Sequence, residues 1–383
     1  MKDETVAIAA TQINDSASAI KEISRAIKTY LGGKHIYLAL TFFTPQYKPT
    51  IIKETLGITL KPKNIFAIQS PLLIFKDKTI QRGIVCCCFI KGTVSIKKIF
   101  IKNADAVTIE FIFRKSIMPF KERNRFLISS LGPQINVYNY LRGLELALGR
   151  NFKVFGAGFF KKYGAKNFVM LNNTIGEGLG SIIVEGNFNV DNIKLRGFIP
   201  LGKSFTITKI APQKNRIIEI DNKPAASVYK KYLENNFELF KKTSIYSYYP
   251  LGIKINNSYR LINVIDILDD DSLLCIGNIK EKSNAHIMMA TPESLLEEIK
   301  KASFNKRSIS DCNLAIIINS LSRRKILKER ADEEIAQVSR IFPDTTKVIG
   351  LYCDYQIFPC DYIRQFTIEN HTLSMILLKY GHH

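Results

Sequence analysis

The N-terminal part of the chain shows an amphipathic helix followed by a buried strand. Apolar residues recur through residues 20–30 at the spacing of one helical face, and Gly32 is suited to end the helix. Residues 35–43 (HIYLALTFF) then form an apolar run typical of a strand. The same order repeats in residues 50–60 and 64–69, so the pattern predicts an α/β arrangement.

The middle of the chain is richer in strand-like segments. Residues 79–90, 94–102 and 106–115 follow one another with little room for crossover helices, so we expect three antiparallel strands. A helix over residues 137–148 and a strand over residues 153–160 are predicted to follow.

The C-terminal quarter carries the most informative pattern. Residues 313–319 (NLAIIIN) form a continuous apolar run, as expected of a strand buried on both faces. A basic turn, a helix over residues 325–342, a strand over residues 347–357 and a polar segment at residues 369–373 come next. In open α/β sheets ligands bind outside the carboxyl ends of the strands, and these ends carry hydroxyl, guanidinium and amide groups.

The motifs in this quarter resemble the second half of a FIST protein, a sensory module found in bacterial signalling proteins and in some eukaryotic F-box proteins. The family's Phe-Ser-Cys-x-Gly-Arg corresponds to residues 318–323, and its Gly-Phe-Tyr-x-x-Gly-Glu corresponds to residues 350–356. Its final Asn-x-Thr corresponds to Asn370 and Thr372. The family cysteine is a serine in this chain, at position 320.

The resemblance implies an α/β protein (mixed α/β and α+β) of two domains, residues 20–203 and 204–383, with mixed, partly antiparallel sheets flanked by helices. It also implies a non-enzymatic sensory module that binds a small polar ligand such as an amino acid or a carboxylate. No effector segment is visible, so we expect the signal to pass by contact to a separate partner protein. The ligand-binding residues implied by the matched positions and their neighbours are Arg260, Ser320, Arg323, Tyr352, Asn370 and Thr372.

Arg323 has a specific expected role in this hypothesis. An arginine beside a strand end can hold a carboxylate through two parallel hydrogen bonds. The strand and helix around it do not by themselves need the guanidinium. We therefore expect removal of Arg323 to abolish ligand binding and to change the stability of the free protein little.

Composition adds a second hypothesis. The 383 residues carry a formal net charge of +21, which suits a basic scaffold that binds nucleic acid or an acidic protein partner. The basic residues are spread along the chain, and with the excess of Lys, Ile and Asn this favours compositional drift over a functional charge. No apolar run is long enough for a membrane span, and the N-terminus has no secretory h-region, so we expect a cytoplasmic protein.

Candidate cofactor and catalytic residues are few. Some FIST proteins bind haem and respond to nitric oxide, and His286 and His371 are the candidate axial ligands for such a haem-based sensor. The seven cysteines have no metal-binding spacing and are expected to be buried thiols. Ser320, His371 and Asp354 could form a triad on paper, but the chain has no G-x-S-x-G elbow, so we expect no enzyme activity and no obligatory cofactor.

Overall fold

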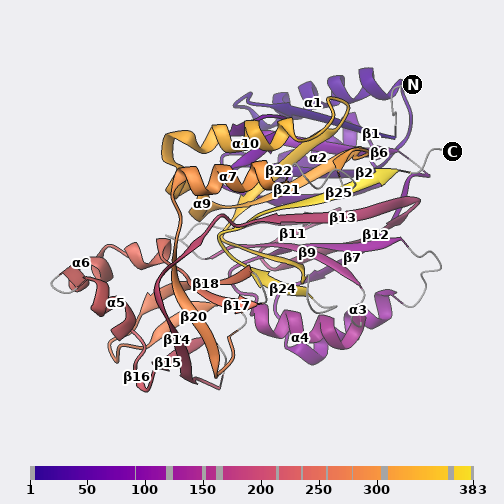
Figure 1. The fold of residues 1–383 in the computed structure, drawn as a ribbon. Coiled ribbons are helices and arrows are strands. Elements are labelled where there is room, and N and C mark those ends of the chain that lie inside the picture. Colours follow the sequence, from indigo (N-terminus) through magenta and orange to yellow (C-terminus); the bar gives the residue numbers. More distant parts are fainter. Residues whose placement is uncertain are drawn as a thin grey trace.

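The protein consists of three similar α/β units and one β-barrel inserted into the third unit (Figure 1). The arrangement is seen in a computed structural model. It describes residues 5–90, 92–117, 124–148, 152–160, 167–212, 215–233, 236–255, 258–277, 279–302, 309–360 and 366–380.

The first sheet is built around a parallel pair joined by a helix. Its strands, in spatial order, are β1 (Val6–Thr11), β6 (Ile84–Ile90), β2 (Ile36–Phe43), β3 (Asn64–Gln69), β10 (Val169–Leu171) and β11 (Thr174–Gly176). β2 and β3 are parallel and the other pairs are antiparallel. Helices α1 (Ser16–Leu31) and α2 (Pro49–Thr59) pack their apolar faces against this sheet. Asp15 caps α1 by accepting a hydrogen bond from the Ser18 amide, and Gly32 ends it in the left-handed conformation.

The second sheet has the same plan. Its strands, in spatial order, are β7 (Val94–Ile101), β12 (Leu179–Gly186), β8 (Arg125–Leu131), β9 (Lys153–Gly158), β23 (Tyr355–Pro359) and β24 (Phe366–Glu369). β8 and β9 form the parallel pair. Helices α3 (Ala106–Ile117) and α4 (Val137–Leu148) cover the sheet.

The third sheet repeats this plan again. Its strands, in spatial order, are β13 (Phe188–Leu195), β25 (Leu373–Tyr380), β21 (Leu314–Ser320), β22 (Lys347–Cys353), β4 (Leu73–Phe75) and β5 (Lys78–Ile80). β21 and β22 are parallel. Its helices are α7 (Pro292–Ala302), α9 (Leu321–Leu327) and α10 (Ala331–Arg340), with the short 3₁₀ turn η3 (Lys328–Arg330) between the last two.

The three units exchange hairpins in a closed cycle. The β4–β5 hairpin of the first unit completes the third sheet, β10–β11 of the second unit completes the first, and β23–β24 of the third unit completes the second. The inner faces of all three sheets share one apolar core, which includes Phe42, Phe155 and Ile316. The helices lie outside this core, each group over its own apolar cluster.

The inserted barrel lies at the side of this assembly (Figure 1, lower left). Its strands, in spatial order, are β14 (Ile199–Ile210), β20 (Ser283–Met289), β17 (Leu251–Ile255), β18 (Ser258–Ile267), β19 (Leu273–Ile276), β15 (Arg216–Ile220) and β16 (Lys223–Pro224). A further β14–β15 pairing closes the ring of six strands. Two helices, α5 (Ser227–Leu233) and α6 (Phe237–Lys242), and the turn η2 (Ile245–Tyr248) cover one side, and the barrel has its own apolar core.

The mixed α/β fold class predicted from the sequence is confirmed, with corrections to several predicted elements. The strand expected over residues 79–90 is divided between β5 of the third sheet and β6 of the first, so it does not pair with β7, which lies in the second sheet. The strand expected over residues 347–357 is divided between β22 of the third sheet and β23 of the second. Residues 106–115 were expected to form a strand but belong to helix α3, because Ile109 and Phe113 lie one helical turn apart and are both buried. The single helix expected over residues 325–342 is instead broken into α9 and α10. Lys328, in the left-handed region at φ 52°, turns the chain between them.

Candidate functional site

Five of the six predicted ligand-binding residues lie together at the carboxyl ends of the third sheet's central strands. Ser320 ends β21 and directly precedes α9, Tyr352 lies on the neighbouring parallel strand β22, and Arg323 lies in the first turn of α9. Asn370 and Thr372 connect β24 to β25. All five are at most 1% exposed, so they form a buried polar layer.

Arg323 is held entirely by protein groups. Its Nε and one terminal nitrogen donate to Glu334 Oε1 at 2.9 and 2.6 Å, and both side chains are 0% exposed. Its other terminal nitrogen donates to the backbone carbonyl of Arg196 at 2.6 Å, with longer contacts to the carbonyls of Leu195 and His371. The expectation that the fold does not need this guanidinium is therefore wrong. Its removal would leave the Glu334 carboxylate buried without its cation.

The other members of the layer also contact the protein itself. The Asn370 amide donates to the carbonyls of Leu261 at 3.2 Å and Ile276 at 2.8 Å, which ties the third sheet to barrel strands β18 and β19. Thr372 donates to the Asn370 carbonyl at 2.7 Å, and the hydroxyls of Ser320 and Ser322 lie 2.9 Å apart. Burial raises the pKa of the Tyr352 hydroxyl well above its usual value.

A second polar cluster lies directly beside this layer, around Glu369, and contains the sixth predicted residue. The Glu369 carboxylate accepts two hydrogen bonds from Arg196 at 2.9 and 3.0 Å, and Lys194 lies 3.5 Å away. The side chains of Glu369 and Lys194 are 2% and 3% exposed. Arg260 of β18 reaches the same place from the barrel and lines, with these three residues, a cavity of about 10 Å³. The cavity's remaining lining residues are Ile255, Ser258, Cys360 and Thr367.

The electrostatics of this cluster favour an anion. Among the described lining residues three side chains are cationic and one is a carboxylate. Burial lowers the pKa of Arg260, the nearby Cys360 and Glu369 oppose that shift, and Arg196 adds to it. A carboxylate or similar anion brought into the cavity would offset the cost of burying these cations.

Sequence reasoning missed Lys194, Arg196 and Glu369. The available signal was the alternation Lys-x-Arg at the end of one strand and a glutamate immediately before the Asn-x-Thr motif. The cluster forms only because β13 and β24 end close together in space, although they are about 170 residues apart. That proximity comes from the hairpin exchange.

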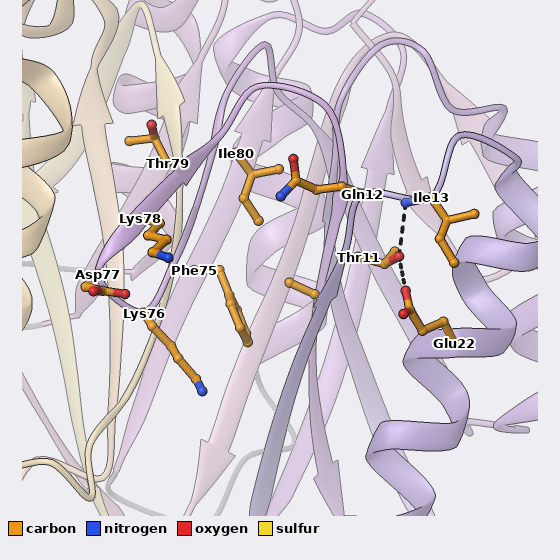
Figure 2. A pocket seen from close by; sticks show the side chains of 11 residues that line it. Thr11, Gln12, Ile13, Glu22, Phe75, Lys76, Asp77, Lys78, Thr79 and Ile80 are labelled. Carbon is orange, nitrogen blue, oxygen red and sulfur yellow. Dashed lines mark hydrogen bonds between the residues drawn. The ribbon is translucent and has the colours of Figure 1, made fainter. Parts of the chain in front are cut away.

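A much larger hollow lies elsewhere, between the end of β1 and the β4–β5 hairpin. It measures about 570 Å³, and Figure 2 shows its lining. Thr11 donates a hydrogen bond to Glu22 of α1 and accepts one from the Ile13 amide. No predicted site residue lines this groove, whose wall residues are Ala10, Thr11, Gln12, Ile13, Glu22, Phe75, Lys76, Asp77, Lys78, Thr79 and Ile80.

The candidate haem ligands, His286 and His371, and Asp354 of the hypothetical triad contact other groups of the protein. His371 Nε2 lies 3.1 Å from Asn263 Oδ1, and burial, reinforced by Arg323, lowers the pKa of His371 to about 3. His286 packs edge-on against Tyr259. Asp354 accepts a hydrogen bond from the Phe160 amide. In the described part of the chain no three His, Cys, Asp or Glu side chains are grouped as a metal site.

Comparison with known families identifies the class of protein. A model of the FIST N domain matches residues 6–223, and a model of the FIST C domain matches residues 225–359. The chain therefore belongs to the FIST family and contains both of its domains, which are sensory and signalling modules. No helix among the described residues is long and apolar enough to cross a membrane.

Two further comparisons add little. A search of curated proteins found no match. Among solved structures, the crystal structure of cyanuric acid hydrolase from A. caulinodans aligns over 98% of this chain and 99% of its own, at 5% identity and a TM-score of 0.38. A similarity this weak carries no argument about function.

Proposed function

We propose that this FIST protein is a non-enzymatic sensory module that binds a small carboxylate, amino acids included, at the cluster of Lys194, Arg196, Arg260 and Glu369. The single observation that carries the proposal is the convergence of three cationic side chains on one small buried cavity. A guanidinium matches a carboxylate in planar geometry and can donate two parallel hydrogen bonds to it.

The position of the cluster suits a sensor. Lys194 and Arg196 belong to the FIST N range, and Arg260 belongs to the FIST C range. A ligand held between them contacts the third sheet and the inserted barrel at once. Ligand binding therefore changes the energy of the contact between two parts of the protein, which is the requirement for a signal.

The size of the cavity adds a conformational step to the proposal. A volume of about 10 Å³ holds about one water molecule, so a carboxylate enters only when the wall moves. The β17–β18 hairpin supplies Ile255, Ser258 and Arg260 and is the wall that belongs to the barrel. In the proposed mechanism the ligand enters the cavity and shifts this hairpin, and a partner protein reads the shift.

The buried polar layer has a supporting role in this proposal. Arg323 donates to the Arg196 backbone carbonyl, and Asn370 donates to the backbone of β18, which carries Arg260, and of its neighbour β19. Ser320, Tyr352 and Thr372 extend the same layer. Direct ligand contact is assigned to Arg260, and these five residues position the cluster.

The test is thermal and chemical unfolding of the protein with the sodium salts of acetate, succinate, glycine and L-glutamate, against sodium chloride at equal ionic strength. A carboxylate at 100 times its dissociation constant should raise the free energy of unfolding by about 2.7 kcal/mol. Arg260→Gln should remove this response. Arg216→Gln, a barrel arginine paired with Asp270 outside the cavity, is the control and should retain it.

Two results would overturn the proposal. One is a protein that none of these carboxylates stabilises beyond the chloride control. The other is an unchanged response in Arg260→Gln.

A further inference from the structure

The cyclic hairpin exchange creates three equivalent gaps, each between the first strand of a unit and that unit's exchanged hairpin. The first lies between β1 and β4–β5, the second between β7 and β10–β11, and the third between β13 and β23–β24. In every case both walls are the outermost strands of their sheets. Outermost strands present unpaired backbone groups and are usually covered in native proteins.

The second and third gaps are closed by the protein itself. In the second gap the Phe100 ring of β7 packs on the backbone of Gly176 in β11, where a Cβ would be 3.0 Å from the ring. In the third gap Lys194 and Arg196 bind Glu369 across the gap, and the β17–β18 hairpin of the barrel contributes to the wall of the small cavity that remains. One closed gap is thus filled by a side chain and the other is lined by an added hairpin.

The first gap is the groove of about 570 Å³ shown in Figure 2. Its β1 wall has hydrogen-bonding capacity on the outer edge. The Ile90 amide donates to the Thr5 carbonyl, and backbone groups in an antiparallel pair point alternately toward and away from the partner strand. Ala7, Ala9 and Thr11 therefore face β6. The amide and carbonyl of Ala10 point outward, toward the groove that Ala10 lines.

The positions of the charged groups in the groove indicate which side chains a bound segment would carry. The ammonium groups of Lys76 and Lys78 lie on the β1 side of the hairpin, and the Asp77 carboxylate lies on the other side (Figure 2). Within the described chain neither lysine forms an ion pair, whereas the charged Glu22 carboxylate accepts a hydrogen bond from the Thr11 hydroxyl at the opposite wall of the groove. Phe75 and Ile80 add apolar surface between the lysines and β1.

We propose that this groove is the docking site for an extended, acidic segment of a partner protein. The segment adds a short strand along the outer edge of β1, and its acidic side chains pair with Lys76 and Lys78. Alternate side chains on its other face pack on Phe75 and Ile80, because successive residues of a strand point to opposite faces. The third gap offers a comparison within the same molecule, because there the extended β17–β18 hairpin lines the space between the two outermost strands.

The experiment measures fluorescence polarisation with a library of labelled hexapeptides that alternate Asp or Glu with Val, Ile, Thr or Phe. Members of the library should bind, and replacement of their acids by Lys should abolish binding. N-methylation of alternate backbone amides keeps charge and composition but removes strand pairing, so it should weaken binding at least about tenfold.

Variants of the protein locate the site. Lys76→Glu/Lys78→Glu should weaken binding at least about tenfold, whereas Lys203→Glu, an exposed lysine of the barrel, should not. Ala10→Pro removes one outward amide and leaves the donors that face β6, so it should weaken binding as well. Arg260→Gln should bind the peptides normally, which separates this result from the carboxylate test.

The proposal is overturned by a library that contains no binder. It is equally overturned by binding that survives N-methylation, which would indicate charge attraction alone, or by binding that the two lysine substitutions leave unchanged.

Discussion

Replacement of Arg323 by methionine tests the most consequential contact in the structure. Arg323 and Glu334 are both 0% exposed, and two of the arginine's nitrogens donate to the same carboxylate oxygen. Removing one member of a buried ion pair typically costs about 3–5 kcal/mol, because the remaining charge is left without a partner. The Arg196 carbonyl also loses its 2.6 Å hydrogen bond, so we expect Arg323→Met to fall in the upper half of that range.

The neighbouring residue Arg324 provides a matched control. Its side chain is 26% exposed and lies 3.9 Å from Asp332, a surface contact worth about 0–1 kcal/mol. Arg324→Met should therefore lower the free energy of unfolding, measured in urea, by no more than that amount.

A double variant separates charge from packing. In the wild type the Asn319 amide donates to Glu334 Oε2 at 2.7 Å. Arg323→Met/Glu334→Gln removes the buried charge, and the glutamine oxygen can still accept this hydrogen bond. The double variant should be more stable than Arg323→Met alone by about 2 kcal/mol. The reasoning is refuted by an Arg323→Met protein within about 1 kcal/mol of the wild type, or by a double variant less stable than the single one.

Two further predictions concern pH and glycine. The folded state keeps His371 neutral down to a pKa of about 3, whereas the unfolded chain takes up the proton near 6.5. The free energy of unfolding should therefore decrease as the pH is lowered from about 6.5 towards 3, by up to about 1.4 kcal/mol per pH unit. His371→Asn, which tolerates the left-handed backbone at φ 53°, should show a shallower fall between about pH 7 and pH 5 in urea titrations, and an equal slope would contradict the assignment. Gly158→Ala should destabilise the protein by at least about 1–3 kcal/mol, because the new Cβ would lie 2.0 Å from the Tyr355 ring. Gly57→Ala, in a helix with nothing within 4 Å of the new atom, should stabilise the protein by about 0.5–1 kcal/mol. A stabilising Gly158→Ala or a destabilising Gly57→Ala in thermal unfolding would contradict this account of the local packing.

The sequence predicted the elements whose periodicity is strong. The first helix and the strand after it were expected from an apolar stripe and a continuous apolar run, and both are present. Helix α3 was missed because its many β-branched and aromatic residues resemble a strand. Asp105, which caps the helix by accepting from the Thr108 amide, was the overlooked signal.

The site was harder to predict than the elements. The strand-end pattern correctly brought Ser320, Tyr352, Asn370 and Thr372 into one layer. It could not show that Glu334 meets Arg323, because that contact depends on the break at Lys328 between α9 and α10. The cluster around Glu369 depends on a hairpin exchange between units, and no local pattern in the sequence encodes such an exchange.

The closed exchange of hairpins also constrains when the protein can fold during synthesis. The β4–β5 hairpin is made early, but its partner β22 begins at Lys347, so the third sheet stays incomplete until about 270 further residues have been synthesised. The second sheet likewise waits for β23 and β24. The barrel has its own core and has no such dependence. The nascent chain therefore carries exposed strand edges until β22 and β23 have been made, a period in which chaperones protect such chains from aggregation.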